Sequence, residues 1–468
     1  MRKTKIIATL GPATDSPEML GKLMDAGLNI FRLNMSHATH DWTRRVVRDI
    51  RALAAERSRV VGILMDTQGP AIRTGDLPVP LHLRPGEHFT FTVRGAKSEE
   101  INSVDVNYAE FINDIHVGDV VLVDNGAIQM KVLAKHGNKV ECEILTDGKL
   151  GSRRHINLPG VKVSLPAMTE KDIADVHLGL ELGVDYIALS FVRTARDVRE
   201  LKKLVTRAKS HRPLIVAKIE DQQAVKNLEA ILMDSDAIMV ARGDLGIEVP
   251  YEELPIIQRR IVKMCLHVGR PVIVATHMLE SMIQSPMPTR AEVTDVANAV
   301  FEQADAIMLS GETTVGKYPV KCVEVLDRIA QRTEQSGGAG YAEQANLTDP
   351  REKLAKSAIV MANELRAQAI VTLIRHGSMT RYLSWLRPRY SLIYAAGPSE
   401  QIACQLALNR GVIPFILPLD PIDLDGNITR ALKTLVEKKF LRKGNTAVVV
   451  SSINADNEIL DAIQMRVV

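Results

Sequence analysis

Charged and hydroxyl side chains follow several short apolar runs in this sequence, each at the point where the run ends. Lys218 and Glu220 follow one run, Arg242 and Asp244 follow the next, and Thr276 follows a third. If these runs are parallel strands of one closed sheet, their carboxyl ends meet on one face. A lone charge at a strand end is usually a solvated cap or an ion pair, but that interpretation would have to hold at every strand. The pattern therefore predicts one polar site.

Two of these carboxylates, Glu220 and Asp244, offer the hard oxygen ligands that Mg²⁺ or Mn²⁺ prefers. The alternative is a plain balance of charge with the neighbouring Lys218 and Arg242. Glycines on both sides of Asp244 can turn backbone N–H groups toward an anion, although such a segment can also be a simple turn. The residues favour a divalent-cation site beside an anion site.

Basic side chains near the same strand ends suit a phosphorylated substrate. Arg32 and Arg73 have the planar guanidinium groups that bind a phosphate through two N–H bonds. Lys218 has two chemical interpretations, a fixed cation beside a developing negative charge or an amine that forms a Schiff base. The residue types alone leave both open.

The elements that must position these residues repeat a short apolar run, a polar residue and a helical pattern. Runs that are apolar on both faces are typical of a parallel sheet covered by helices. The eight runs are Ile6–Leu10, Asn29–Leu33, Val60–Met65, Tyr186–Leu189, Leu214–Ala217, Ala237–Val240, Val272–Ala275 and Ala306–Leu309. Eight strands close a (β/α)8 TIM barrel, and an open doubly wound sheet is the alternative. The barrel is favoured because no GxGxxG follows the first run and because polar residues follow many runs.

Two segments depart from this repeat. Residues 70–166 alternate apolar and polar residues between turn signals, which predicts a small β-barrel domain inserted after the third strand as a lid. Residues 334–340 are small and polar and predict a flexible linker. We therefore expect an α/β fold with a discontinuous catalytic barrel (1–69 and 167–340), the inserted β domain and a C-terminal α/β regulatory and oligomerisation domain (345–468). Four runs predict strands of that last domain: Ala369–Ile374, Ser391–Ala395, Val412–Leu417 and Thr446–Val450.

The composition excludes several classes of protein. The 59 basic and 56 acidic residues leave a net charge of +3, and no segment concentrates the basic ones, so we expect no nucleic-acid or membrane partner. The first apolar run is too short for a secretory signal, and no stretch reaches the ~20 apolar residues of a membrane span. The four cysteines are scattered without a CxxC pair, which is typical of reduced thiols. A cytoplasmic location follows as an expectation.

Several ordered segments together closely resemble pyruvate kinase, and the resemblance spans essentially the whole chain. The segments are Lys3-Thr4-Lys5-Ile6, Leu10-Gly11-Pro12-Ala13-Thr14, Arg32-Leu33-Asn34-Met35-Ser36-His37, Asn157-Leu158-Pro159-Gly160, Val216-Ala217-Lys218-Ile219-Glu220, Met239–Gly246, Pro288–Glu292 and Met308–Thr313. Any one of them can arise by chance, but the ordered set does not. The resemblance implies the same three-part fold. It also implies Mg-dependent transfer of a phosphoryl group from phosphoenolpyruvate to ADP, which gives pyruvate and ATP at the end of glycolysis.

The resemblance implies roles for the residues that match the family. Glu220 and Asp244 would bind Mg²⁺ (or Mn²⁺). The residues implied at the phosphoryl group are Lys218, Arg32 and Arg73, and those implied at the substrate carboxylate are Gly243, Asp244 and Thr276. Ser310 and Glu312 would stand behind Thr276 in a proton relay to the enolate. Because a threonine hydroxyl is a poor acid, we expect a water to take part.

Further matches concern the nucleotide and a monovalent cation. The implied nucleotide-binding residues are Asn34, His37, Arg73 and Arg154, and the implied K⁺ ligands are Asn34, Ser36, Asp66 and Thr67. Arg154 stands where many relatives have lysine, and His277 stands where they have glutamine. A neutral, hydrogen-bonding His277 is favoured over a new catalytic acid.

Position 71 is the most informative departure from the family. Relatives that require K⁺ have glutamate at this position. Relatives that do not require K⁺ have lysine, which replaces the ion. This chain has Ala71. We expect that K⁺ still stimulates the reaction because no built-in cation replaces it.

In the C-terminal domain, one loop lies where relatives bind a phosphorylated allosteric effector. Its residues are Arg375, His376, Gly377, Ser378 and Thr380. The match is weak, and a plain surface loop is an equal alternative. The resemblance alone suggests a homotetramer.

Two other functions compete with this one. A carbon–carbon lyase would use Mg²⁺ and an enolate, or Lys218 as a Schiff base, but would have little use for Arg73 and the lid. A metabolite-binding regulator on a retired barrel fits poorly because Lys218, Glu220, Asp244 and Thr276 are intact.

Overall fold

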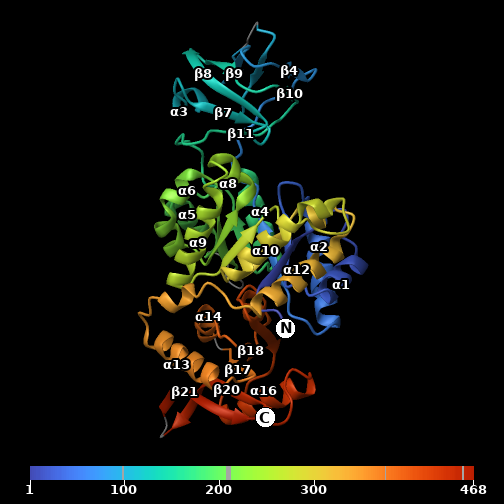
Figure 1. Cartoon of the computed structure of the whole chain (residues 1–468), viewed down its shortest axis with the longest axis vertical. Helices are drawn as coiled ribbons and strands as arrows, with labels where there is room; N and C mark the ends of the chain where they lie inside the picture. The colour runs from blue at the N-terminus through green and yellow to red at the C-terminus, as the bar shows by residue number, and fades with distance from the viewer. Residues whose placement is uncertain (97–99, 207–211, 375, 456–457) are drawn as a thin grey trace.

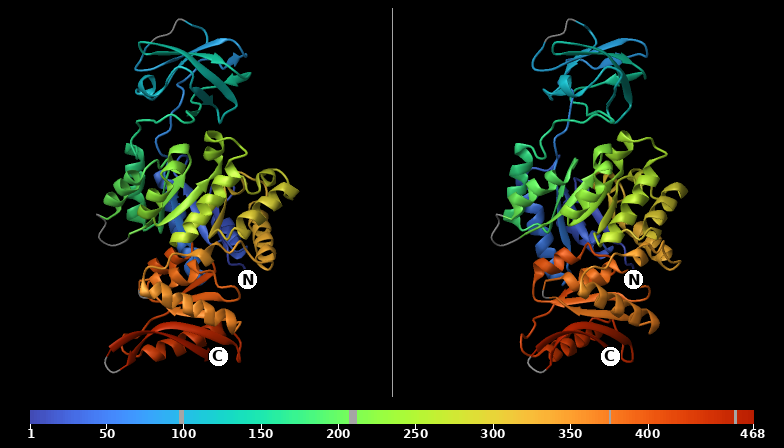
Figure 2. Two further views of the ribbon diagram at one scale, coloured as in Figure 1. Left: turned by 60° about the vertical axis from the view of Figure 1, so that its left-hand side comes forward. Right: turned by 90° about the vertical axis from the view of Figure 1, so that its left-hand side faces the viewer.

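The computed structural model describes residues 1–96, 100–206, 212–374, 376–455 and 458–468, without the side chains of 452–460. The molecule is elongated, with a barrel in the middle, a β lid at one end and a C-terminal α/β unit at the other (Figures 1 and 2). The N-terminus lies where the barrel meets the C-terminal unit (Figure 1). Nowhere in the described ranges does a helix have the length and hydropathy to cross a bilayer.

A closed barrel of eight parallel strands forms the centre, as predicted, in the order β1-β16-β15-β14-β13-β12-β3-β2. Its strands are β1 (Lys5–Thr9), β2 (Ile30–Asn34), β3 (Gly62–Asp66), β12 (Tyr186–Leu189), β13 (Leu214–Ile219), β14 (Ala237–Ala241), β15 (Val272–Ala275) and β16 (Ala306–Leu309). Each overlaps one predicted apolar run. Alternate side chains such as Ile7 and Ile30 fill the interior, whereas Ile6 and Phe31 pack outward against helices. Both faces are therefore buried, which explains why the runs show no polar alternation.

Helices surround the barrel and connect its strands. They are α1 (Pro17–Asp25), α2 (His40–Glu56), α4 (Glu170–Leu182), α5 (Ala195–Val205), α6 (Gln222–Lys226), α7 (Leu228–Asp234), α8 (Arg242–Glu248), α9 (Leu254–Val268), η1 (Glu280–Ile283), α10 (Arg290–Phe301), α11 (Gly311–Thr314), α12 (Pro319–Glu334) and η2 (Tyr341–Gln344). Thr169 and Thr289 start α4 and α10 with capping boxes. Gly269 ends α9 at φ 74°, and a Cβ there would lie 2.8 Å from the Trp385 ring. Only glycine fits this helix end.

The lid between β3 and β12 has its own core. Its elements are β4 (Leu81–Leu83), β5 (His88–Thr92), β6 (Ser103–Asp105), α3 (Phe111–Asp114), β7 (Val120–Val123), β8 (Ile128–His136), β9 (Lys139–Ile144), β10 (Gly148–Leu150) and β11 (Ile156–Asn157). Phe89, Phe91 and Phe111 stack edge to face with ring centroids 4.9 and 5.6 Å apart. Because this cluster is separate from the barrel core, the lid can move without unpacking either one.

The C-terminal unit is a five-stranded sheet in the order β19-β18-β17-β20-β21. Its elements are α13 (Pro350–Glu364), β17 (Ala369–Leu373), α14 (Ser378–Trp385), β18 (Leu392–Gly397), α15 (Glu400–Leu406), β19 (Val412–Ile416), α16 (Leu424–Glu437), β20 (Thr446–Ala455) and β21 (Glu458–Val467). Sequence analysis predicted four strands and missed β21. That strand runs antiparallel at the edge of the sheet, so it has no long apolar run.

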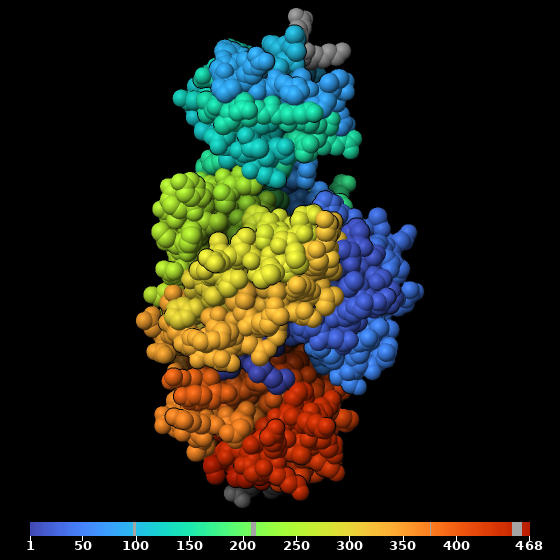
Figure 3. Space-filling model, turned by 45° about the vertical axis from the view of Figure 1, so that its right-hand side comes forward, coloured from blue at the N-terminus to red at the C-terminus, as the bar shows by residue number. Residues whose placement is uncertain are grey.

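The prediction of a flexible linker at 334–340 is wrong for its first residue, Glu334. Glu334 is the last residue of α12, and its carboxylate accepts the N–H groups of Lys3 and Thr4 at 2.8 and 2.7 Å. It also lies 3.5 Å from Arg410 of the C-terminal unit. The first residues of the chain are thus held between the two units, where they are visible in Figure 3.

A buried ion pair joins the same two units. Arg387 donates to Asp305 at 2.7 Å, and their side chains are only 4% and 3% exposed. Arg387 also donates to the carbonyl oxygens of Ser384 and Gln303. Trp385 adds an indole N–H bond to the carbonyl of Leu266. The barrel and the C-terminal unit are therefore fixed to each other by polar groups out of contact with water.

Replacing Arg387 by methionine should lower the free energy of unfolding by about 3–5 kcal/mol, because Asp305 would remain buried without its counter-ion. Urea unfolding followed by circular dichroism measures this change. The matched control is Lys433→Met, whose exposed pair with Glu437 is 3.9 Å long and should contribute less than about 0.5 kcal/mol. Equal unfolding midpoints for the two variants would contradict the buried ion pair.

Candidate functional site

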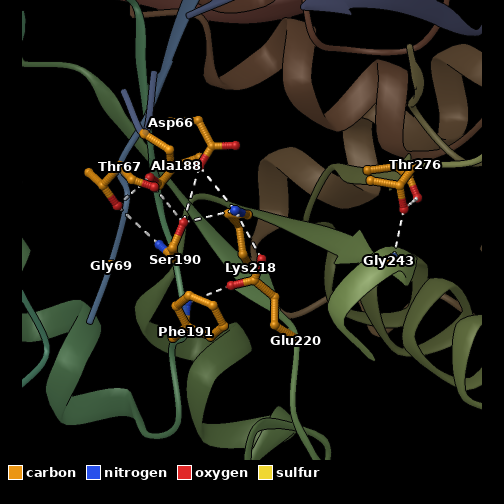
Figure 4. Close-up of polar contacts among 12 residues, drawn as sticks. Asp66, Thr67, Gly69, Ala188, Ser190, Phe191, Lys218, Glu220, Gly243 and Thr276 are labelled. Atoms are coloured by element: carbon orange, nitrogen blue, oxygen red, sulfur yellow. Dashed lines mark hydrogen bonds and ion pairs between the residues drawn. The ribbon is translucent and has the colours of Figure 1, made fainter. Parts of the chain in front are cut away.

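Of the side chains predicted to converge, Lys218 and Glu220 are in contact near the end of β13, whereas Thr276 lies apart from them beside Gly243 (Figure 4). Lys218 Nζ lies 2.8 Å from Ser190 Oγ, 3.1 Å from Asp66 Oδ1 and 2.9 Å from Glu220 Oε1. These partners come from the carboxyl ends of β3, β12 and β13, which are neighbours in the barrel. The barrel thus assembles one cationic centre from three strands.

Asp66 is the counter-ion that this centre shares with Arg32. Arg32 Nε donates to Asp66 Oδ2 at 2.7 Å, and its Nη1 donates to Thr9 Oγ1 at 2.9 Å. Burial alone would raise the pKa of Asp66, but the adjacent cations Lys218 and Arg32 lower it. Asp66 therefore stays ionised although it is completely buried.

Lys218 is a charged ammonium group in this setting. Burial alone would lower the pKa of Lys218, but Asp66 and Glu220 outweigh burial and raise it above that of a free lysine. A protonated amine cannot attack a carbonyl carbon. The surroundings of Lys218 therefore favour the fixed-cation interpretation over the Schiff base.

Glu220 and Asp244 have the features of a divalent-cation site. The pKa of Glu220 is raised to about 7. Burial is the main cause, the charge of Lys218 opposes the rise, and the charge of Asp244 contributes to it. Phe191 N–H donates to one oxygen of Glu220 at 2.6 Å, and the other oxygen forms the ion pair with Lys218 at 2.9 Å. Among the described residues, no group of three or more His, Cys, Asp or Glu side chains is arranged as a metal site. The chain thus offers two oxygen-bearing carboxylates, and substrate and water would supply the other ligands.

Ser190 connects these groups, and sequence analysis missed it. Its hydroxyl accepts from Lys218 and lies 2.6 Å from the Thr67 carbonyl and 3.2 Å from Asp66 Oδ1. It directly follows the run Tyr186–Leu189, so the strand-end rule that identified the other residues would have found it.

A strained turn after β15 carries Thr276. Both Thr276 and His277 adopt left-handed backbone conformations, with φ 67° and 55°, at a cost of about 1–3 kcal/mol each. Thr276 Oγ1 accepts the Gly243 N–H at 2.8 Å and donates to the carbonyl of Ala275 at 2.6 Å (Figure 4). Asp244 follows Gly243 in the first turn of α8. The turn therefore places one hydroxyl beside the N–H groups that begin a helix.

Ser310 and Glu312 lie at the end of β16 and support the loop that follows Thr276. Glu312 is fully buried and accepts the N–H groups of Leu279 and Ser310 at 2.9 and 2.7 Å. The Ser310 hydroxyl is buried without a hydrogen-bond partner. In the described part of the chain no hydrogen bond joins either residue to Thr276, so the relay through them stays a prediction. His277 is exposed.

A cavity of about 370 Å³ opens above Lys218, Glu220 and Asp244, and the lid supplies its opposite wall. Arg73 and Arg154 line that wall, and Arg73 Nη1 donates to the Arg153 carbonyl at 3.2 Å. Arg154 lies 3.4 Å from Asp124. The cavity is therefore bounded by cations on both sides, which suits a phosphate group.

A second cavity of about 780 Å³ adjoins the first and shares Arg32 and Asn34 with it. His37 lines it, as do Pro12 and Trp42, which sequence analysis did not single out. A flat aromatic face and a proline are suitable walls for a nucleobase. The predicted nucleotide residues are thus divided between this cavity and the lid wall.

Three of the predicted K⁺ ligands, Asn34, Ser36 and Thr67, line the first cavity together with Ala71. Asn34 Oδ1 accepts the Ser36 N–H at 3.2 Å, and the Thr67 carbonyl accepts from Ser190. The fourth, Asp66, is engaged by Arg32 and Lys218. All four offer oxygen atoms, which are suitable ligands for a hard cation.

Two residues at the junction of lid and barrel were also missed. His155 lines the first cavity, and its ring centroid lies 6.0 Å from that of Phe191. Burial lowers the pKa of His155; Asp244 opposes this shift and Arg73 adds to it. Behind it, Asn157 of β11 donates to Glu248 of α8 at 3.0 Å. The second contact ties the lid to the barrel.

The suggested effector loop lies at the start of α14. Gly377 precedes that helix at φ 78°, Ser378 is its first residue and His376 is exposed. Thr380 is 1% exposed, so its hydroxyl is not at the surface. Arg375 lies outside the described residues.

Comparison with known proteins gives consistent results over the whole chain. The family model described as "Pyruvate kinase, barrel domain" matches residues 1–323, and "Pyruvate kinase, alpha/beta domain" matches residues 352–460. Plastidial pyruvate kinase 2 of Arabidopsis thaliana is 43% identical over 96% of this chain and 78% of its own length. Pyruvate kinase 2 of Synechocystis is 40% identical over 96% and 76%. A crystal structure of a Cryptosporidium parvum pyruvate kinase is similar with a TM-score of 0.93 and 33% identity, covering 99% of this chain and 96% of that one.

The surroundings of Glu248 predict how stability depends on pH. Burial raises the pKa of this carboxyl group to about 7, so the folded state favours its protonated form. The stability that this group contributes is full below its unfolded pKa, ~4.5, and is lost as the pH rises through about 7. The melting temperature should therefore fall less between pH 5 and 8 in Glu248→Gln than in the parent chain. A matched variant, Glu252→Gln on the exposed surface, should keep the parent's fall, and identical pH profiles for all three proteins would contradict the assignment.

Proposed function

The chain belongs to the pyruvate kinase family, and we propose that Lys218, Arg32 and Arg73 hold the phosphoryl group that it transfers. The enzyme is a phosphotransferase that converts phosphoenolpyruvate and ADP into pyruvate and ATP. The observation that carries the assignment of residues is the buried ammonium of Lys218, kept charged by Asp66 and Glu220 at the base of a cavity walled by arginines.

Phosphoryl transfer needs little covalent work from the protein, so positioned positive charge does most of the catalysis. When the bond between phosphorus and the enol oxygen breaks, its electron pair stays on that oxygen, and the ADP oxygen forms the new bond to phosphorus. Lys218 stabilises the resulting enolate. Asp66 holds Lys218 and Arg32 in fixed directions, so no reorganisation is needed as charge develops.

Glu220 and Asp244 are the residues that would hold Mg²⁺ or Mn²⁺. Their mutual repulsion and their oxygen atoms at the edge of the substrate cavity support this role. The ion would offset negative charge between the substrate phosphate and the carboxylates. In this proposal the two carboxylates orient the substrate through the ion that they hold, and Lys218 stabilises the enolate.

The enolate must next take a proton at its terminal carbon. In this proposal the Gly243 N–H and the Thr276 hydroxyl bind the substrate carboxylate, and a water held by Thr276 delivers the proton. Ser310 and Glu312 would support this water from behind, and closure of the lid would exclude other water from the phosphoryl group.

ADP would occupy the second cavity, with its base beside His37 and Trp42 and its phosphates toward Asn34, Arg73 and Arg154. The cavity volume of about 780 Å³ is sufficient for a nucleoside. The shared residues Arg32 and Asn34 connect this cavity with the substrate cavity, so the phosphates would meet at their junction.

The competing functions lose support from the site. A Schiff-base lyase needs a neutral lysine, but the ion pairs of Lys218 keep it protonated. A binding protein without catalysis gives no reason for the strained Thr276 turn beside the helix start, since strain of this kind is typical of catalytic sites.

The domain limits and the cytoplasmic location remain proposals from the sequence pattern and composition. The homotetramer and the phosphorylated effector at His376, Gly377 and Ser378 rest on the resemblance to relatives. One relative is plastidial and another is cyanobacterial, so the compartment differs within the family.

Replacing Lys218 by methionine should lower the rate of pyruvate formation by about 10²–10³-fold or more, because the enolate loses its counter-charge. The assay supplies phosphoenolpyruvate, ADP, Mg²⁺ and K⁺ and couples pyruvate to lactate dehydrogenase. Lys226→Met, an exposed lysine after the same strand, is the control and should keep full activity. Full activity of Lys218→Met would refute the proposed role, and no turnover by the folded parent enzyme would support the lyase or regulator.

Potassium should stimulate the parent enzyme, because the side chain of Ala71 supplies no charge that could replace the ion beside Asn34, Ser36 and Thr67. Ala71→Lys would place an ammonium group there and should make the rate severalfold less sensitive to K⁺. Rates measured with and without K⁺, at constant ionic strength set by tetramethylammonium chloride, test both statements. Equal rates for the parent in the two buffers would contradict a K⁺ site.

A further inference from the structure

We propose that Arg242 is a positioning residue that holds Thr276 in its working orientation. This inference rests on the proposed role of Thr276 and adds a residue that does not itself meet the substrate. Sequence analysis offered Arg242 only as a balance for the charge of Asp244. The structure instead pairs it with Asp295 of α10 at 2.7 Å, and neither residue lines the substrate cavity.

The side chain of Arg242 holds both carbonyl groups at the strained turn. Its Nε donates to the carbonyl oxygen of Ala275 at 3.2 Å, and its Nη2 donates to that of Thr276 at 2.5 Å. These carbonyls immediately precede the two residues with positive φ and lie within the turn. A guanidinium group has the planar, forked set of donors that such a pair of acceptors requires.

The same contacts set the direction of the Thr276 hydroxyl. Thr276 Oγ1 donates to the carbonyl of Ala275, which is also an acceptor for Arg242. The main chain of the next residue, Gly243, donates to the same Oγ1. Arg242 and its neighbour therefore fix the Thr276 hydroxyl from both sides.

Arg242 is itself held rigidly. It is 8% exposed, and Asp295 and Gln258 accept from its Nη1 at 2.7 and 3.4 Å. Gln258 in turn donates to Glu302 at 3.1 Å. Arg242 does not line either cavity of the site but donates directly to the carbonyl of Thr276, so we expect its effect on the reaction to pass through Thr276.

The test separates proton transfer from phosphoryl transfer. Exchange of pyruvate methyl protons with D2O, followed by NMR with the full enzyme, Mg²⁺, K⁺ and ATP, reports the step at Thr276. For Arg242→Met we expect losses of about 10- to 100-fold in both exchange rate and kcat, since small displacements of a catalytic group have effects of this size. The KM for ADP should stay within about twofold because the nucleotide cavity is separate. Arg242→Lys should have an exchange rate and a kcat between those of Arg242→Met and the parent, since one ammonium group replaces the forked donors of the guanidinium group.

Two kinds of control keep the result interpretable. Arg196→Met removes an arginine of α5 whose side chain is 81% exposed and pairs with the 38% exposed Glu200, and it should match the parent. Thermal unfolding identifies variants that fail to fold; if Arg242→Met is one of them, Arg242→Lys and Asp295→Asn must show the loss of exchange instead.

The outcomes distinguish this inference from the proposed function. Loss of exchange in Thr276→Val and in the Arg242 variants supports both. Loss in Thr276→Val with exchange within about twofold of the parent in the Arg242 variants overturns the positioning role alone. Normal exchange in Thr276→Val overturns the role of Thr276 and, with it, this inference.

Discussion

The site depends on one buried carboxylate, Asp66, which is placed between two cations. Isolated, such a group would be neutral, because burial of a charge without a partner costs several kcal/mol. With Arg32 on one oxygen and Lys218 on the other, it stays ionised and keeps both cations in fixed positions. The barrel makes this arrangement possible, because the three side chains lie at the ends of the rigid strands β2, β3 and β13.

The cation cluster and the Thr276 turn are located on different sides of the same face, and Phe191 (φ 51°) adds a positive-φ residue on the side of the cluster. The cation cluster lies on the side of β2, β3, β12 and β13, whereas the positive-φ turn lies after β15. Asp244 and Gly243 on α8 stand between these regions. Under the proposed function, separate sets of contacts would support phosphoryl transfer and proton transfer.

Much of the fold and of the site was predictable from local sequence. Barrel strands are apolar on both faces, and the polar residue after each one identified Lys218, Glu220, Asp244 and Thr276 without knowledge of their contacts. Ser190 could have been found by the same rule. The pairing of Arg242 with Asp295 could not, because it joins distant positions through a side-chain direction that spacing does not encode. Likewise β21 and the anchoring of Glu334 depend on tertiary partners rather than on local pattern.

The contacts of the first strand have a consequence for the order in which the protein can be completed on the ribosome. β1 pairs with β2 and with β16, which is made about three hundred residues later. Lys3 and Thr4 bind Glu334, and Arg410 approaches the same carboxylate. During synthesis β1 must therefore wait for β16, with an open sheet edge exposed until β16 emerges. Closure of the barrel therefore requires β16, and docking of the C-terminal unit around Glu334 requires the still later Arg410.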